Sequence, residues 1–599
     1  MFRRLVIPLV VIVMAVTTTW PLATQLDRSI PQGVESSPTV PVFNLWTVGW
    51  NLDRVWAGWR NFWNAPHFHP TEKTLALSEP LIASQALAGF AWLPPPVAYN
   101  VFLLLAIALN AGLTWRALRH RRVRWPVALL VSLAMARLPF VHQQLGLLQC
   151  VLVAGLIGTI HFGEDACTTG RLSSLGLAAA CFDLTFLACG YYGVFLVLLL
   201  PAWGGVLIWQ CARRIASRPA RRAREGSEVL DKSTPRWRVG LVLGSLSTRR
   251  RLIVGVVGVL LILAVIVPVV LVQSRVLSDP TYERPRELIQ ELSARPTDYL
   301  ATAFPEWFQF VGHSRWHQAG RWKLSPGLLK YALALFGLVV GLRSSTRRGW
   351  TLTWLAVSVS AFVGSRGLNF QIVGICPYAT LLEWFPTIAR LRTPARMSVL
   401  VQIAVVFLAA EALHFGFRKA RIFARRSESR RLNMRLRTVL AFGMFWLIGI
   451  AACYEVSLPR LSFVEVPSIE SQKGWIDWLK QNTTEDAVIA QVPFPKGPSP
   501  RDYESEAWTM YWGLFHHRRM VNGYSGFFPA SYLELKAQMQ SFPDEPSFAA
   551  LRSRGVTFCV CKQSFLNSIR LPEHSESSAP WELVFQDHLA EIAVLRLRR

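Results

Sequence analysis

The sequence predicts an α-helical polytopic membrane protein that carries a small extracytoplasmic α/β domain at its C-terminal end. The 599 residues are 52% hydrophobic and 17% charged, whereas soluble proteins contain about 25% charged residues. Between residues 5 and 456, apolar stretches alternate with arginine-dense loops. Roughly eleven of these stretches are long enough to cross a bilayer as helices.

The arginine-dense loops also account for the formal net charge of +27. Lysine and arginine accumulate in those loops of membrane proteins that stay in the cytoplasm. No nucleic-acid-binding motif accompanies the charge, so we expect no nucleic-acid partner. The charge therefore marks which side of the membrane each loop occupies.

The chain begins MFRRLVIPLVVIVMAVTTTW, a basic start followed by an apolar core. This pattern fits either a signal peptide or an uncleaved first helix. No clean small-x-small cleavage site follows, which favours the uncleaved helix with Arg3 and Arg4 on the inside. We expect a multi-pass protein of the cytoplasmic (inner) membrane with a cytoplasmic N-terminus.

A single assignment brings every strongly basic loop to the same side of the membrane. Residues 81–93 are shorter than the ~20 residues of a full crossing, and counting them as a crossing would place the later basic loops outside. We therefore expect 81–93, like 44–59, to form an interfacial or re-entrant helix. The predicted crossings are residues 5–22, 97–115, 126–138, 150–162, 172–189, 191–211, 252–272, 327–342, 350–362, 397–415 and 438–454.

From residue 458 to residue 599 the composition becomes that of a soluble protein. Stretches 487–491 and 556–561 are typical of short buried strands, and 476–481 favours a helix. We therefore expect an external α/β domain over 458–599, behind a membrane domain over 1–457. The nine cysteines show no spacing typical of zinc ligands, so we assign no metal site.

The polar residues of chemical interest lie in three predicted external loops. Cations stabilise a lipid-phosphate leaving group, and a carboxylate accepts the proton of an acceptor hydroxyl. Any one of these residues is more readily explained as a solvated loop residue or as an anchor at the membrane interface. Long loops as a whole, however, are where functional residues concentrate. The loops are 23–96 with Asp27, Arg28, Glu35, Asn44, Asp53, Arg54, His67, His69, Glu72, Lys73 and Glu79; 273–325 with Asp279, Glu283, Arg284, Arg286, Glu287, Arg295, Asp298, His313, Arg315, His317, Arg321 and Lys323; and 364–396 with Arg390, Arg392 and Arg396.

Short motifs spread along the chain resemble, in their order, the bacterial polytopic members of the GT-C glycosyltransferase superfamily that use lipid-phosphate sugars. The resemblance covers most of the length, and it is more specific for the family than for one activity. The motifs are TWPL at 19–22, PVFNLW at 41–46, FHP at 68–70 with TLALSE at 74–79, PVAYN at 96–100, GYY at 190–192, ARLRTPAR at 389–396, VNGYSGF at 521–527 and LRSRGV at 551–556.

The resemblance implies a GT-C membrane fold and an inverting transfer of a sugar from a polyprenyl-phosphate carrier to an external glycan, lipid or protein of the cell envelope. In the family, an acid of the first external loop is the catalytic base or orients the acceptor. Val40 occupies that position here, so Glu35 and Asp53 are the candidate catalytic acids, and Glu79 matches a second family acid. The resemblance also makes Arg284, Arg286, Arg392 and Arg396 candidates for binding the donor phosphate, and Asn44, His67 and His69 candidates on the acceptor side.

Two other interpretations stay open. The valine at position 40 also fits a catalytically inactive GT-C relative that acts in envelope assembly. Asp183, which lies inside a predicted crossing, would fit a transporter of a lipid-linked substrate or a hydrogen bond between packed helices. No cofactor is indicated by the sequence, and a divalent metal is neither required nor excluded.

Overall fold

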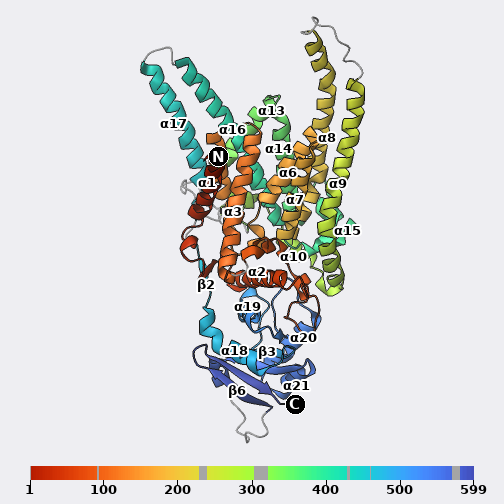
Figure 1. Cartoon of the computed structure of the whole chain (residues 1–599), viewed down its shortest axis with the longest axis vertical. Coiled ribbons are helices and arrows are strands. Elements are labelled where there is room, and N and C mark those ends of the chain that lie inside the picture. Colours follow the sequence, from red (N-terminus) through yellow and green to blue (C-terminus); the bar gives the residue numbers. More distant parts are fainter. Residues whose placement is uncertain are drawn as a thin grey trace.

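The protein consists of a helix bundle whose lower end rests on a small C-terminal sheet, with the first external loop between the two (Figure 1). The long helices run along the longest axis of the molecule, and the chain ends at the tip of the sheet region. The computed structural model describes residues 2–90, 93–227, 239–302, 322–427, 432–458, 461–569 and 580–598.

A helix lies in each stretch that the sequence predicts to cross the membrane. Local signals set several of the boundaries: Pro95 and Pro96 open one helix at its first turn, and Gly170, with φ of +71°, ends another. The helices are α1 (Phe2–Thr18), α3 (Pro95–His120), α4 (Trp125–Ala136), α6 (Ala154–Thr169), α7 (Leu172–Ala188), α8 (Gly190–Ser227), α9 (Val239–Val276), α13 (Leu328–Arg343), α14 (Arg348–Ser365), α16 (Ser398–Ser427) and α17 (Leu432–Tyr454).

Within the described residues, 6 helical segments are long and apolar enough to cross a membrane, which indicates a multi-pass membrane protein. Three further apolar helices, Val6–Thr18, Leu172–Ala188 and Val439–Tyr454, are shorter. The predicted number of crossings therefore stays a prediction. The 6 segments are Pro95–His120, Trp125–Gln143, Leu148–Thr169, Gly190–Gln210, Val256–Val276 and Pro394–Ala424.

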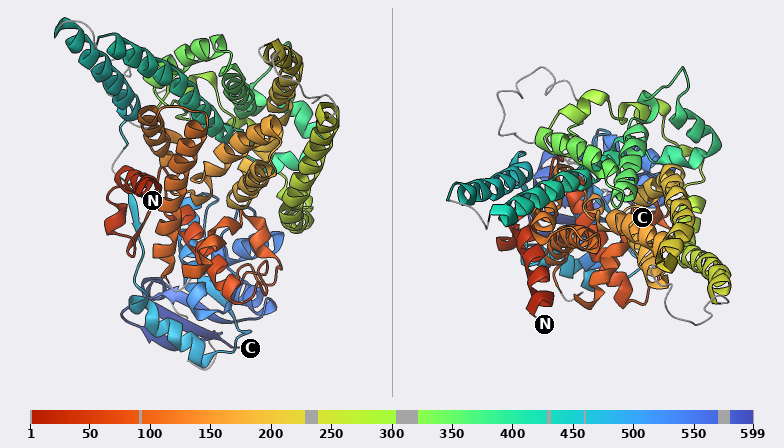
Figure 2. Two further views of the ribbon diagram at one scale, coloured as in Figure 1. Left: turned by 45° about the horizontal axis from the view of Figure 1, so that its top comes forward. Right: turned by 90° about the horizontal axis from the view of Figure 1, so that it is seen from above.

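Apolar side chains face outward on the helices at the rim of the bundle. Seen from above, the α16–α17 pair and α9 lie at opposite edges (Figure 2). Leu260 of α9 and Leu447 of α17 are 59% and 69% exposed. Exposed apolar surface on this scale is stable only against another apolar medium, and lipid provides one.

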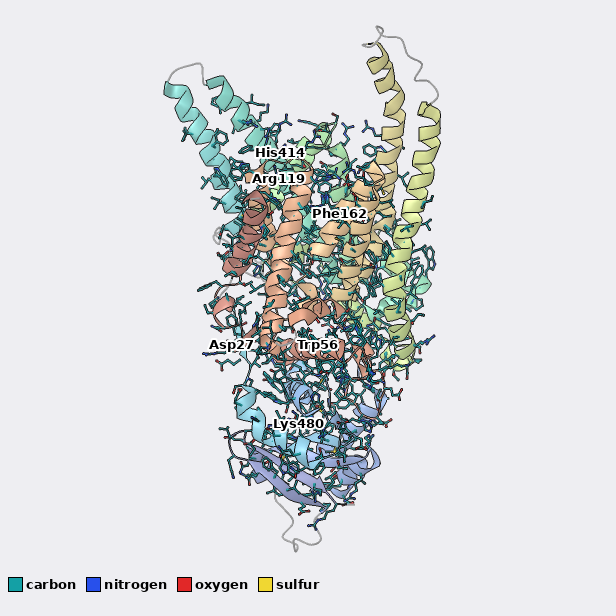
Figure 3. All side chains as sticks on the ribbon, viewed as in Figure 1. Asp27, Trp56, Arg119, Phe162, His414 and Lys480 are labelled. Atoms are coloured by element: carbon teal, nitrogen blue, oxygen red, sulfur yellow. The ribbon has the colours of Figure 1, made fainter. Side chains whose placement is uncertain are left out.

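The basic ends of the helices lie together at the end of the bundle opposite the sheet. There, Arg121 pairs with buried Glu164 at 3.0 Å, and Arg347 pairs with buried Glu411 at 2.7 Å. The Arg347 guanidinium also donates to the Arg121 carbonyl at 3.3 Å, which joins the ends of α3 and α14. Figure 3 places Arg119 and His414 at this end and Lys480 at the other. The described basic residues of these helix ends lie at one end of the bundle (Figure 3), and the side of the membrane that this end faces stays a prediction.

The first external loop contains β1 (Ser29–Pro31), α2 (Thr39–Trp56), η2 (Thr74–Leu77) and η3 (Ile82–Phe90). Helix α2 runs across the ends of the bundle helices (Figure 1). Helix α2 corresponds to the helix predicted over 44–59. The sequence predicts that helix to lie at the membrane interface, whereas every residue of α2 from Pro41 to Leu52 is buried within the protein. The short 3-10 helix η3 replaces the helix predicted over 81–93 and fits the expectation that this stretch does not cross.

The C-terminal sheet has five strands in the order β4-β3-β5-β7-β6. Helices connect β3, β4 and β5, which are parallel, whereas β7 is antiparallel to both β5 and β6. The predicted strands 487–491 and 556–561 correspond to β3 and β5. The elements are β3 (Val488–Val492), β4 (Arg519–Met520), β5 (Val556–Lys562), β6 (Trp581–Asp587), β7 (Ile592–Leu597), α18 (Lys473–Asn482), α19 (Glu504–His516), α20 (Ala530–Gln538), α21 (Glu545–Ser553) and α22 (Gln563–Ser568).

Shorter elements lie in the loops between the bundle helices and between the elements of the C-terminal region. They are α5 (Pro139–Gln143), α10 (Arg286–Glu291), α15 (Pro377–Trp384) and β2 (Phe463–Glu465), with the 3-10 turns η1 (Leu22–Thr24), η4 (Leu148–Cys150), η5 (Pro280–Tyr282), η6 (Pro296–Leu300), η7 (Gly367–Asn369), η8 (Pro386–Arg390), η9 (Pro394–Met397), η10 (Ile469–Gln472), η11 (Pro500–Tyr503) and η12 (Met539–Ser541).

Backbone pairing joins the first external loop to the C-terminal region. Strand β1 pairs antiparallel with β2. At the edge of the larger sheet, the Met520 amide donates to the Pro66 carbonyl at 2.7 Å, and the His69 amide donates to the Met520 carbonyl at 2.8 Å. The loop therefore covers the otherwise open edge of β4. These contacts cross the boundary predicted at residue 458, so the division into two domains stays a prediction.

A buried carboxyl group stabilises this junction. Glu506 of α19 accepts hydrogen bonds from Asn522 at 3.0 Å and Tyr532 at 3.3 Å. Asn522 in turn bonds the backbone of Gln491 in β3 and accepts from the Phe68 amide of the first loop. Burial raises the pKa of Glu506 to about 8, although its hydrogen bonds oppose the shift.

We predict that Glu506 makes the protein less stable as the pH rises. A carboxyl group whose pKa is raised on folding holds its proton more tightly in the folded state, so stability is lost as the pH rises from the ordinary value of 4.5 towards about 8. At pH 9, Glu506→Gln should therefore be more stable than the parent by a few kcal/mol, since each unit of pKa shift corresponds to ~1.4 kcal/mol. Thermal unfolding in detergent at pH 5 and pH 9 measures the difference. The exposed Glu534→Gln on α20 is the control, and identical pH profiles for the parent and Glu506→Gln would contradict the prediction.

Candidate functional site between the bundle and the C-terminal sheet

Glu35 lies on a tight turn that follows β1 and presses against the end of α5. Gly33 at the turn has φ of +66°, and a Cβ there would come within 2.8 Å of the Gln143 carbonyl. The Val34 amide donates to the same carbonyl at 3.1 Å. The turn is therefore fixed to the bundle, and it holds the half-buried Glu35 side chain in place.

Two arginines of the third external loop act on the Glu35 carboxyl. Burial raises the pKa of Glu35, and the positive charges of Arg396 and Arg392 oppose that shift. A raised pKa makes a carboxylate a better proton acceptor, and nearby cations favour its ionised form. Val40, at the position of the family aspartate, instead packs against the main hydrophobic core.

Glu79 meets the start of α8. Its Oε2 accepts from the Gly190 amide at 3.0 Å, and the Tyr191 amide also donates to this carboxyl. The negative charge thereby satisfies backbone donors at a helix N-terminus. Burial raises the pKa of Glu79, while these bonds and the charge of Arg396 oppose the rise. Because its oxygens are engaged by these two amides, Glu79 positions the start of α8.

Three arginines gather beside these carboxyl groups. Arg396 stacks over the Tyr191 ring at 4.9 Å. Arg284 stacks over the Phe527 ring at 4.1 Å and donates to the Gly526 carbonyl. Burial and the nearby positive charge of Arg392 together lower the pKa of Arg284 to about 10. Two guanidinium groups that repel each other make a site that an anion would stabilise.

Tyr524 connects the members of this group. Burial raises the pKa of its phenol to about 12, and the charges of Arg392, Glu35 and Arg284 all act on it. Residues from the first, second and third loops and from the C-terminal region therefore converge. We name this set the glutamate–arginine cluster; it comprises Glu35, Glu79, Arg284, Arg392 and Arg396 with Tyr191 and Tyr524.

Arg286 and Asn44 lie outside the cluster. Arg286 is the exposed first residue of α10, and no contact of the described residues places it beside the other arginines. Asn44 is buried and donates to the Gly146 carbonyl at 2.9 Å, which fastens α2 to the loop after α5. Four residues of the second loop, His313, Arg315, His317 and Arg321, lie outside the described residues.

Asp53, His67 and His69 line a separate cavity of about 440 Å³ between α2 and the C-terminal region. Asp53 accepts from the neighbouring Arg54 at 3.0 Å, and Arg54 stacks over Trp50 at 4.6 Å. None of the residues of the glutamate–arginine cluster lines this cavity. Its walls combine aromatic rings with charged and amide groups: Trp46, Trp50, Asp53, Arg54, Asn61, Asn64, Ala65, Pro66, His67, His69, Pro70, Thr71, Glu72, Glu485, Gly513, Leu514, His517 and Arg519. We name it the loop–sheet cavity.

His67 is the most deeply buried polar group of the loop–sheet cavity. Its side chain is 1% exposed, and its ring lies edge-on to Trp46 at 5.0 Å. Within the described residues, neither ring nitrogen of His67 has a hydrogen-bond partner, and the Trp46 Nε1 has none either. Burial lowers the pKa of His67 to about 3, so the ring is neutral at physiological pH. Burial and the charge of Arg519 also lower the pKa of His69. Buried polar atoms left unpaired in this way offer bonds to a ligand.

Tyr191 and Tyr524 lie in the motifs GYY and VNGYSGF, but the sequence assigned neither tyrosine a role. The prediction also missed His517 and Arg519, which line the loop–sheet cavity from the C-terminal region. The signal that could have found the tyrosines was the aromatic residue inside GYY and NGYSG. Nothing local in the sequence marks His517 or Arg519, because only the pairing of β4 with residues 66–69 brings them to the cavity.

Comparison with known proteins gives little further information. No protein-family model matches the chain, and no curated protein matches it. Among solved structures, the chain is similar to the archaeal oligosaccharyltransferase AglB from Archaeoglobus fulgidus in complex with an inhibitory peptide and a dolichol-phosphate. The TM-score is 0.44 and the sequence identity 11%, over 94% of this chain and 69% of that chain.

Proposed function

We propose that this protein is an integral-membrane glycosyltransferase of the GT-C type. It would transfer a sugar, with inversion, from a polyprenyl-phosphate carrier to an external acceptor. The observation that carries the proposal is that the positive charges of Arg392 and Arg396 act on the Glu35 carboxyl, which is half-buried on a turn fixed to the bundle.

The arginines supply the donor side of the reaction. Arg392 and Arg284 are close enough for their charges to act on each other, and a lipid phosphate between them would relieve the repulsion. Arg396 is the third residue of a segment long and apolar enough to cross the membrane, Pro394–Ala424, so a phosphate bound there would lie at the border of the apolar region. A polyprenyl chain can then stay in lipid while its headgroup reaches the cluster.

Glu35 supplies the acceptor side. The acceptor hydroxyl loses its proton to the Glu35 carboxylate and forms the new bond to the anomeric carbon of the sugar. At the same time the bond between that carbon and the phosphate oxygen breaks, and polyprenyl phosphate leaves with the electron pair. The guanidinium groups stabilise the negative charge that grows on the leaving phosphate.

The loop–sheet cavity would hold a more distant part of the acceptor. Tryptophan faces beside amide and carboxyl groups suit a saccharide or a polar peptide. Segment 521–527 links this cavity to the cluster: a Cβ at Gly523 would lie 3.1 Å from the His67 side chain, while Tyr524 belongs to the cluster. The proposal therefore gives Asp53, His67 and His69 a role in binding the acceptor and leaves the proton transfer to Glu35.

Glu35→Gln should abolish most of the turnover without unfolding the protein. Removing a general base costs about 10²- to 10⁴-fold in rate. The measurement is release of polyprenyl phosphate from polyprenyl-phosphate sugars by the purified full chain in detergent. Glu465→Gln is the matched control, because Glu465 is an exposed acid on β2, directly paired with β1. Equal turnover of Glu35→Gln and the parent would refute the role of Glu35.

Arg392→Gln should weaken donor binding more than it slows the bound complex. A hydrogen bond to a charged group contributes about 1.5–3 kcal/mol, so KM for the donor should rise by about 10- to 100-fold. Arg392→Lys should restore part of the loss, because it keeps the charge but not the planar fork. Arg286→Gln, which lies outside the cluster, should leave KM unchanged, and an equal effect of both substitutions would count against the donor site.

A catalytically inactive relative remains the second candidate, and the packing of Val40 into the core is the observation that favours it. It predicts that the combined substitution of Glu35, Asp53 and Glu79 leaves the cellular glycans unchanged. Deletion of the gene, followed by analysis of envelope glycans, separates the two: loss of a glycan on deletion that the triple variant fails to restore supports the enzyme.

A further inference from the structure

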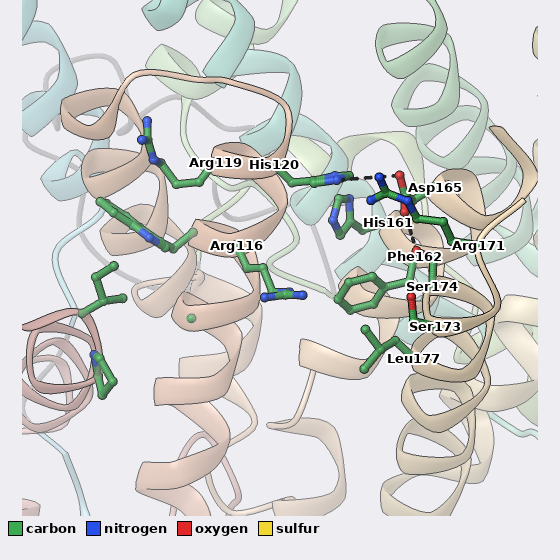
Figure 4. A pocket seen from close by; sticks show the side chains of 14 residues that line it. Arg116, Arg119, His120, His161, Phe162, Asp165, Arg171, Ser173, Ser174 and Leu177 are labelled. Carbon is green, nitrogen blue, oxygen red and sulfur yellow. Dashed lines mark hydrogen bonds and ion pairs between the residues drawn. The ribbon is translucent and has the colours of Figure 1, made fainter. Parts of the chain in front are cut away.

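We propose that a groove at the basic end of the bundle binds an anionic phospholipid. The groove has a volume of about 610 Å³ and lies between α1 and α3 on one side and α6 and α7 on the other (Figure 4). This site does not rest on the proposed glycosyltransferase activity. It lies at the opposite end of the bundle from the glutamate–arginine cluster, near Arg119 in Figure 3.

The charged residues of the groove favour an anion. Three arginines, Arg116, Arg119 and Arg171, line it together with one acid, Asp165. Asp165 is already engaged, because it faces His120 at 3.7 Å and accepts from the Ser174 hydroxyl. Asp165 is the one acid among the lining residues, and it is already bonded. Among the described residues, the arginines of the groove therefore have no carboxylate partner there.

Arg116 and Arg171 are the free cations of the groove. Figure 4 shows Arg116 pointing from α3 towards α6 and α7, where Arg171 begins the turn into α7. Arg116 lies over the Phe162 ring at 5.4 Å. Neither guanidinium group forms a hydrogen bond or an ion pair with the described residues. Arg119, by contrast, donates to the Val123 carbonyl at 2.6 Å.

A buried histidine adds a second polar group. His161 is 2% exposed and lines the groove, and its Nδ1 has no hydrogen-bond partner among the described residues. A phosphate oxygen near Arg116 would give this nitrogen a partner. Desolvated unpaired groups of this kind carry a cost that a bound ligand removes.

The remaining wall of the groove is apolar and partly open. Ile7 and Pro8 of α1, Trp115 of α3 and Leu177 of α7 form it. A Cβ built on Gly112 would meet no protein atom within 4 Å, so space is open above this position of α3. Apolar walls that lead to unpaired arginines at the basic ends of membrane helices match an acyl chain with an anionic headgroup. A free phosphate would use the arginines and leave the apolar wall unused.

The test measures the binding of phosphatidylglycerol to the full chain in mixed detergent micelles, by thermal shift and by native mass spectrometry. Phosphatidylcholine and inorganic phosphate are the two comparison ligands. We expect phosphatidylglycerol to raise the Tm, and the two comparison ligands to leave it unchanged. The double variant Arg116→Gln with Arg171→Gln should bind phosphatidylglycerol about 30-fold more weakly, from about 1 kcal/mol for each arginine.

A second variant blocks the groove without changing any charge. Gly112→Leu should also abolish the thermal shift, because its side chain enters the open space. The controls are Arg124→Gln, an exposed arginine at the start of α4, and Gly416→Leu, a glycine of α16 that also has open space above it. Both should keep the shift. Equal shifts with phosphatidylcholine or with phosphate alone, or equal losses in the control variants, would overturn the proposal.

Discussion

The burial of α2 between the helix bundle and the C-terminal sheet is the constraint on which the external half of the molecule depends. On one side Asn44 bonds to the loop after α5, and Asn51 bonds to Ser84 of η3. On the other side Gly49 faces Leu514 of α19 so closely that a Cβ would come within 2.4 Å of it. Because both faces are covered, α2 is held in place, with the turn that carries Glu35 before it in the chain and the wall of the loop–sheet cavity along its C-terminal half.

Paired and unpaired arginines have different roles in this protein. At the basic end, Arg121 and Arg347 are paired with buried glutamates, which removes the cost of placing charge among packed helices. In the glutamate–arginine cluster, three arginines face two acids, and Glu79 is already used by the start of α8. The surplus of positive charge there is what a phosphate would neutralise, whereas the paired arginines serve the packing of the helices.

Features with a local signal could be predicted from the sequence, and those that depend on distant contacts could not. Apolar runs and arginine loops located a helix in each predicted stretch, and the length of 81–93 predicted that it does not cross. Short apolar runs located β3 and β5. The burial of α2 was missed because its cover comes from α19, more than four hundred residues away in the sequence. For the same reason Glu35 and Asp53, which are near in sequence, could not be assigned to separate sites.

We propose that the glutamate–arginine cluster holds the phosphate of a lipid-linked sugar, with Glu35 facing the acceptor side. A cryo-electron-microscopy structure of the full chain with a non-transferable polyprenyl-phosphonate sugar tests it most directly. We expect the phosphonate against Arg284 and Arg392, with the Glu35 carboxylate on the opposite side of the anomeric carbon. A headgroup bound away from these arginines, with Glu35 remote from the sugar, would contradict it.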